Sequence, residues 1–288
     1  MVSTFWTNTI WYVLLGIITL FELIYTFFKA EKRSQVFAFF ITILGVFLWI
    51  ETPLVIFFKA YTYYPKILTQ VPNPFDDVLA GNLFSQFSIA AAALLMVVRK
   101  LKYYWYLIFA VLYSLIEELF LALGIYKHYW YQTWMTFVFF PLLFWLVKIM
   151  YEKITSGIKP LFYYVYIFTG FFPLYIITLN WGLMLIGIQD MSPSVLSDPI
   201  MSRHILVVLQ YIIFAIPLMV MYFSKAHLRW KALVVIALYI LYYIAFKFNL
   251  ILIKDGWFWP VSTANIFWMY FSVVLHDKLY GNVKILNP

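Results

Sequence analysis

Five ionisable side chains lie inside long apolar stretches of this 288-residue chain, and they are the residues that could do chemistry: Glu22, Glu51, Glu117, Glu118 and Lys247. A charged side chain at the centre of a membrane helix costs at least ~2.5 kcal/mol, so it normally faces the interior of a bundle, finds a partner or reaches the interface. Carboxylates in such an interior can hold a cation or a proton. The first of the five lies close to a basic segment, which makes it an interfacial residue, and the other four are candidates for a site.

Three of these four share one depth. Glu51, Glu118 and Lys247 each follow the expected inner end of their helix by 15 residues, which is roughly 22 Å at the α-helical rise. Amide side chains on neighbouring helices reach a similar level, and we expect the lysine to pair with one of the carboxylates. The pattern predicts a polar pocket in the outer half of a membrane, formed by Glu51, Asn82, Gln86, Glu117, Glu118, Lys247 and Asn265.

The adjacent Glu117 and Glu118 point about 100° apart on a helix, so we expect one in the interior and the other at the boundary. Two interpretations fit the pocket. One is a proton- or cation-binding site that opens outward. The other is a structural polar network that locks helices together.

The elements that position these residues are nine apolar runs, each about long enough to cross the ~30 Å hydrocarbon core of a membrane as a helix. Hydrophobic residues make up 65% of the chain and charged residues 11%, and the mean hydropathy is +0.90, which excludes an ordinary soluble domain. The fold class is therefore an all-α polytopic membrane bundle. The predicted helices are Ile10–Phe28, Val36–Phe58, Leu79–Val98, Tyr103–Tyr126, Thr133–Met150, Leu161–Ile188, Ile205–Phe223, Ala232–Ile253 and Trp257–Leu275.

Basic residues in the connecting segments predict the orientation. Segments on one side carry 14 Lys and Arg, and those on the other side carry 5. The positive-inside rule then places the N-terminus outside and the C-terminus in the cytoplasm. No repeat of fixed period is visible, so residues 1–288 are interpreted as a single transmembrane domain.

Three further patterns concern packing. The third run contains the small residues Ala90 to Ala93, which predicts a central helix that its neighbours approach closely. Asp198 followed by Pro199 predicts a helix N-cap. Aromatic residues gather at the predicted outer ends of helices, where their rings suit the headgroup level. We expect an interfacial belt of Tyr61, Tyr63, Tyr64, Tyr126, Tyr129, Trp130, Tyr131, Trp134, Trp257 and Trp259.

Motifs of known chemistry are missing from the sequence. Cysteine is absent, the four histidines are far apart, and there is no HExxH, GxSxG or Walker motif. We therefore assign no catalytic residue, no metal ligand and no cofactor. The net charge of +8 lies in short loops that set orientation, so the expected partner is a lipid bilayer and not a nucleic acid.

The segments Asn82–Gln86, Ile116–Phe120 and Leu123–Tyr126, followed by Trp130 and Trp134, resemble a family of uncharacterised multi-pass membrane proteins from endospore-forming Gram-positive bacteria. The resemblance covers residues 1 to about 155. It implies a bacterial cytoplasmic membrane and a spore-related setting, and it supplies no activity and no catalytic residue.

These observations together predict a multi-pass membrane protein that binds or transports a small solute or cation through the polar pocket. One alternative is a non-catalytic membrane component that assembles with a membrane protein partner. The third hypothesis is an intramembrane enzyme.

Overall fold

The structure, a computed structural model, describes residues 4–224 and 226–286. Within these residues the fold is all-α, and nine helical segments are long and apolar enough to cross a membrane, which confirms the predicted number. Each segment overlaps one predicted run. They are Phe5–Lys29, Arg33–Phe57, Phe75–Val98, Tyr104–Ala122, Thr133–Ser156, Pro160–Leu185, Pro199–Phe223, Leu228–Lys247 and Phe258–Tyr280.

The fourth segment ends earlier than predicted. Helix α4 (Tyr104–Ala122) stops before Tyr126 because Gly124 takes a φ of +68°, a left-handed conformation that favours glycine and ends helices. The chain then enters the short strand β2 (Tyr126–His128).

The eighth segment also ends early, and this corrects the position of a candidate site residue. Helix α9 (Leu228–Lys247) is followed by Asn249, whose φ of +53° turns the chain into strand β4 (Ile251–Ile253). Lys247 is therefore the last residue of its helix, and its side chain is exposed. The prediction that this lysine lies buried within a span is wrong.

The described chain forms two compact units, a division that the sequence does not reveal. Unit 1 comprises residues 1–164 and 279–288, and unit 2 comprises residues 165–278. Each unit has its own pair of short strands, and the helices 160–175 and 258–280 cross from one unit into the other.

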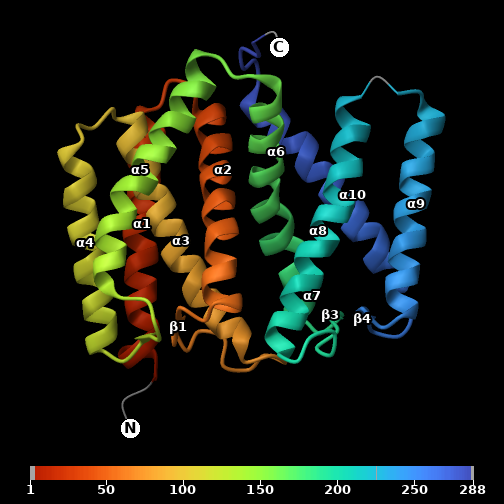
Figure 1. Ribbon diagram of the computed structural model, residues 1–288, viewed down its shortest axis with the longest axis horizontal. Helices are drawn as coiled ribbons and strands as arrows, with labels where there is room; N and C mark the ends of the chain where they lie inside the picture. Colours follow the sequence, from red (N-terminus) through yellow and green to blue (C-terminus); the bar gives the residue numbers. More distant parts are fainter. Residues whose placement is uncertain (1–3, 225, 287–288) are drawn as a thin grey trace. The chain divides into compact units, whose positions relative to one another are not determined.

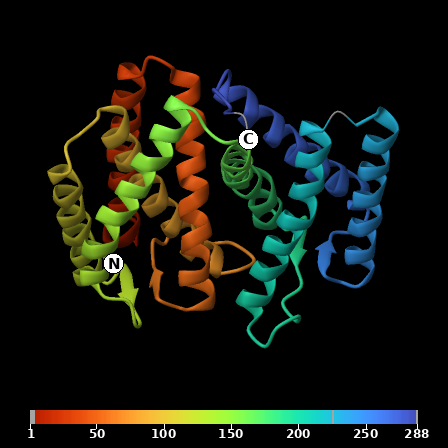
Figure 2. The ribbon, with the colours of Figure 1, turned by 45° about the horizontal axis from the view of Figure 1, so that its top comes forward.

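Unit 1 is built around α3 (Phe75–Val98). Helices α1 (Ile10–Lys29) and α2 (Arg33–Thr52) pack along α3, and α4 packs against α5 (Thr133–Ser156), as Figures 1 and 2 show. Ala90 to Ala93 have no exposed surface. This burial confirms that the small residues of the third run mark a central packing helix.

A strand pair connects two loops at one end of unit 1. Helix α2 continues into the π-helical turn η2 (Pro53–Phe57), and the chain then reverses through Lys59, which has a φ of +48°. Strand β1 (Tyr61–Tyr63) follows and pairs antiparallel with β2, with Tyr61 opposite His128. The reversal places β1 next to the end of α2.

The first helix of unit 2 ends in a π-helical turn, as α2 does in unit 1. Strands β3 and β4 pair antiparallel, with Gln189 opposite Ile253. Asp198 caps α8 as predicted, since its carboxylate accepts hydrogen bonds from the backbone N–H groups of Ile200 (2.9 Å) and Met201 (3.2 Å). Besides α9 and β4, the elements are α6 (Pro160–Tyr175), η3 (Ile176–Asn180), α7 (Trp181–Leu185), β3 (Gln189–Met191), α8 (Pro199–Phe223) and α10 (Phe258–Tyr280).

The two units repeat one order of elements. In unit 1, β1 is followed by α3, α4, β2 and α5, which begin at residues 75, 104, 126 and 133. In unit 2, β3 is followed by α8, α9, β4 and α10, which begin at residues 199, 228, 251 and 258, so each lies 124 or 125 residues after its counterpart. The matching order, spacing and strand pairing indicate an internal repeat, which the sequence analysis missed.

Candidate binding site

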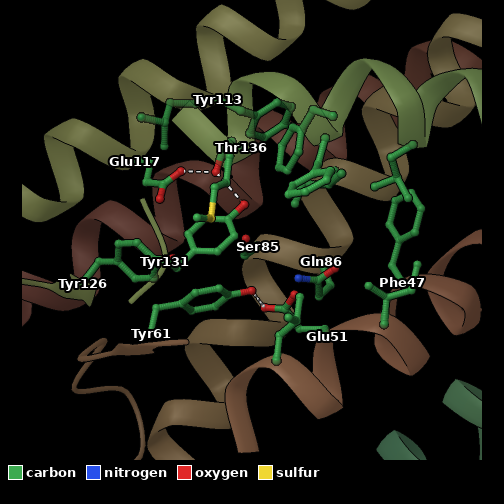
Figure 3. A pocket seen from close by; sticks show the side chains of 18 of the residues that line it. Phe47, Glu51, Tyr61, Ser85, Gln86, Tyr113, Glu117, Tyr126, Tyr131 and Thr136 are labelled. Carbon is green, nitrogen blue, oxygen red and sulfur yellow. Dashed lines mark hydrogen bonds between the residues drawn. The ribbon is translucent and has the colours of Figure 1, made fainter. Parts of the chain in front are cut away.

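A cavity in unit 1 brings part of the predicted pocket together. Its volume is about 650 Å³, and residues from all five helices of the unit and from both strands line it (Figure 3). Most of the lining is aliphatic or aromatic. The polar side chains of the lining are Glu51, Tyr61, Tyr63, Ser85, Gln86, Tyr113, Glu117, Tyr126, Tyr131 and Thr136.

Glu51 lies near the end of α2, and strand β1 supplies its hydrogen-bond donors. Its side chain is buried, with 6% of the residue exposed. The hydroxyl of Tyr61 donates a hydrogen bond to Oε1 over 2.5 Å, and the hydroxyl of Tyr63 lies 3.5 Å from the same oxygen. Alternate residues of a strand face the same side, which explains why both phenols reach Glu51. The amide of Gln86 lies on the other side of Glu51 (Figure 3).

Glu117 lies on a different wall of the same cavity. The Thr136 hydroxyl on α5 donates to its Oε2 over 2.5 Å, and its Oε1 contacts Nε2 of His128 on β2. Thr136 in turn is 3.0 Å from the Tyr131 hydroxyl. Figure 3 shows the Glu117–Thr136 pair and the Glu51–Tyr61 pair on opposite sides of the cavity. Two carboxyl groups therefore face one apolar space from opposite walls.

Four tyrosines form a packed cluster beside the two carboxyl groups. The ring of Tyr61 is 5.3 Å from that of Tyr126 and 5.0 Å from that of Tyr131, and the ring of Tyr63 is 5.0 Å from that of Tyr126. Burial raises the pKa of Tyr61, Tyr63 and Tyr126 well above the usual value, and nearby carboxyl groups raise it further. Their phenols therefore stay neutral and can donate hydrogen bonds at any ordinary pH.

The structure corrects the assignment of these four rings to an interfacial belt. Tyr61, Tyr63, Tyr126 and Tyr131 are all at most 9% exposed, so they belong to the interior of unit 1. The alternation of two tyrosines around Thr62 is typical of a strand with one buried face, and it could have identified the first two.

The other predicted pocket residues lie in different places. Asn82 is buried one helical turn before Gln86, and Nε2 of Gln86 lies 3.4 Å from Oδ1 of Asn82. Glu118 is exposed outside the cavity, and it points about 100° away from Glu117 around α4, so the expectation of one interior and one boundary residue is met. Lys247 and Asn265 belong to unit 2, and the ammonium group of Lys247 lies 5.5 Å from the ring of Tyr243. Of the seven predicted residues, the described lining of the cavity includes Glu51, Gln86 and Glu117.

Unit 2 has a polar centre of its own, and all its members are neutral. The Tyr175 hydroxyl donates to Oδ1 of Asn265 over 2.5 Å and accepts from Nε2 of Gln210 over 3.1 Å. Oε1 of Gln189 accepts from the Tyr242 hydroxyl over 2.9 Å and from Nδ2 of Asn265 over 3.0 Å.

Several of these residues occupy positions that correspond between the two units. Gln86 and Gln210 each lie 11 residues after the first residue of their helices, α3 and α8. Glu117 and Tyr242 each lie five residues before the last residue of α4 and α9. The internal repeat therefore extends to the polar centres, but unit 1 has a carboxyl group where unit 2 has a phenol.

Comparisons of the chain with protein-family models, with curated proteins and with solved structures find no match. The chemistry of the site is therefore argued from its own geometry. Two carboxyl groups in an apolar cavity can accept hydrogen bonds from a ligand or pair with a cationic group, and the surrounding rings can hold an apolar part of that ligand.

Proposed function

We propose that this chain is a multi-pass membrane protein that binds a small molecule in the cavity of unit 1, with Glu51 and Glu117 in contact with the ligand. The single observation that carries this proposal is that both carboxyl groups face one cavity of about 650 Å³. A cavity of this size suits a small organic ligand, and the few polar groups on its walls would orient that ligand. Release of the bound molecule on one side of the membrane would make the protein a transporter.

The nine apolar helices of the described residues support insertion into a bilayer. The excess of basic residues on one side supports an orientation with the N-terminus outside and the C-terminus in the cytoplasm. The resemblance of residues 1 to about 155 to proteins of endospore-forming bacteria favours a bacterial cytoplasmic membrane. Intact cells should therefore allow a membrane-impermeant maleimide to label Lys127→Cys but not Lys102→Cys, and the reverse pattern would contradict the orientation.

The cavity would be reached from the side. Several lining residues on α5 are strongly exposed, among them Trp134 (60%), Phe139 (53%) and Leu142 (55%). Apolar residues at the mouth of a cavity in a membrane helix would face acyl chains. A ligand that dissolves in the bilayer could therefore reach Glu51 and Glu117 without crossing a polar surface.

The absence of cysteine allows a direct test of the cavity with single substitutions. Ser85 lines the cavity, whereas Ser88 on the same helix is buried and its hydroxyl lies 2.9 Å from that of Tyr113. In purified protein, methyl methanethiosulfonate should modify Ser85→Cys much faster than Ser88→Cys. Equal slow modification of both, together with copurification of a stoichiometric protein, would favour the role of a membrane component that assembles with a partner.

A further inference from the structure

In the part of the chain that the structure describes, the cavity of unit 1 is lined by acidic side chains that have no lysine or arginine beside them. Its described lining includes two carboxyl groups and no lysine or arginine. His128 contacts Glu117, but the partners of Glu51 are neutral. The Tyr61 phenol donates to it, and the Tyr63 hydroxyl and the Gln86 amide lie beside it. Because electrostatic attraction is strong where water is excluded, a cationic group on a ligand would be favoured beside Glu51.

Aromatic rings surround the space next to this carboxyl group. The ring of Tyr61 contacts those of Tyr126 and Tyr131, and Trp130 and Trp134 also line the cavity. The faces of such rings attract organic cations, as in the aromatic cages that bind quaternary ammonium groups. The rings and the carboxyl groups therefore favour the same kind of ligand.

Size and geometry favour an organic cation over a metal ion. Within residues 4–224 and 226–286, no three His, Asp or Glu side chains are placed to share one metal ion. Glu51 and Glu117 approach the cavity from opposite walls (Figure 3). The volume of the cavity is about 650 Å³, and most of its lining is apolar. Such a space suits an apolar body that carries its charge at one end.

The internal repeat argues that the carboxyl groups serve binding and not only helix packing. Unit 2 builds its polar centre from neutral groups, with Tyr242 at the position of Glu117. Tyr175, the last residue of α6, holds the position of Thr52, which follows Glu51 in α2. The same order of elements can thus be held together without buried acids. The acids are a property of the unit that contains the cavity.

On these grounds we propose that the ligand of unit 1 is an amphipathic organic cation, with its ammonium-type group between Glu51 and Glu117 and its apolar body toward the residues of α5 at the mouth. This proposal rests on the binding function proposed above. It adds the chemical class of the ligand.

The test uses two probes that differ only in charge. Benzyltrimethylammonium and neopentylbenzene have the same shape, because one has a quaternary nitrogen where the other has a carbon. Full-length Ser85→Cys protein in lipid nanodiscs is modified with methyl methanethiosulfonate in the presence of each probe. We expect the cation to slow modification in a saturable way and the hydrocarbon to have little effect. Glu51→Gln and Glu117→Gln should each raise the half-protecting concentration of the cation about tenfold, the change that corresponds to roughly 1.4 kcal/mol.

Glu118→Gln is the matched control, since this neighbouring carboxyl group is exposed outside the cavity, and it should leave protection unchanged. Equal protection by both probes would overturn the cation proposal while the binding cavity would stand. Protection by the cation that survives both Glu51→Gln and Glu117→Gln would also overturn it. No modification of Ser85→Cys even without a probe would overturn the proposed function together with the ligand class.

Discussion

Replacing Tyr61 with phenylalanine removes one oxygen atom from the wall of the cavity and, with it, the 2.5 Å hydrogen bond to Glu51. A hydrogen bond contributes about 0.5–1.5 kcal/mol to stability between neutral groups and about 1.5–3 kcal/mol when one partner is charged. The hydroxyl of Tyr63, at 3.5 Å from the same oxygen, is too distant to replace it without movement of β1. Because the ring remains and no cavity is created, we expect Tyr61→Phe to lower the free energy of unfolding by about 2 kcal/mol.

Reversible unfolding of the purified protein by sodium dodecyl sulfate measures this free energy. The matched control is Tyr104→Phe, whose ring is 54% exposed and which should cost less than about 0.5 kcal/mol. A double-mutant cycle with Glu51→Gln then isolates the contact, and we expect a coupling of at least about 1 kcal/mol between positions 61 and 51. If Tyr61→Phe costs no more than Tyr104→Phe, or if the cycle shows no coupling, the account of how Glu51 is held is wrong.

Three other predictions concern a close helix approach, a helix cap and the buried tyrosines. Gly81→Ala places a Cβ 2.7 Å from the Cβ of Tyr63, an atom that cannot rotate away. The variant should therefore lose about 1–3 kcal/mol of stability in the same unfolding assay, and an unchanged stability would contradict the close approach of α3 to β1. Asp198→Ala removes the N-cap of α8 and should cost about 1 kcal/mol, which Asp198→Asn should largely avoid; equal losses in the two variants would refute the capping role. Burial raises the pKa of Tyr61 and Tyr126, so near pH 10 these phenols ionise in the unfolded chain but not in the folded one. The free energy of unfolding should therefore be full below about pH 10 and should fall as the pH rises above that value. This fall should be smaller in Tyr61→Phe, and an identical pH dependence in the variant would count against the buried cluster.

The nine helices could be predicted because a membrane-spanning helix needs a long apolar run, and such runs are visible without any knowledge of packing. Helix ends were harder to predict, since Gly124 and Asn249 end their helices through a left-handed backbone and leave apolar residues such as Ile251 outside the helix. Hydropathy alone does not distinguish a strand of three apolar residues from one more helical turn.

The candidate site could be predicted only in part, because the sequence gives the depth of a residue along its helix but not where that helix lies among the others. Glu51 and Gln86 are expected together from their depth, and they do line one cavity. Glu118 shares that depth but is exposed, and its neighbour Glu117 lines the cavity instead. Lys247 and Asn265 were added on the same argument, but depth does not determine which helices are neighbours, and both residues belong to unit 2. The lysine illustrates a second difficulty, since its position depended on a helix end that the sequence placed six residues too late.

The tyrosine cluster and the internal repeat were missed for different reasons. Aromatic residues near helix ends are usually interfacial, and only the strand pairing of β1 with β2 buries the rings of Tyr61 and Tyr126. The repeat is visible in the order of elements but not in residue types, because the polar centre of unit 2 has a phenol at the position of Glu117.

The most direct test of the central claim is an experimental structure of the full-length protein in a lipid nanodisc, determined with and without benzyltrimethylammonium. We predict that Glu51 and Glu117 line one cavity within unit 1 and that the cation appears between them, beside the rings of Tyr61 and Tyr131. A map in which packed side chains separate the two carboxyl groups, or in which the space between them stays empty at saturating probe, would contradict the account.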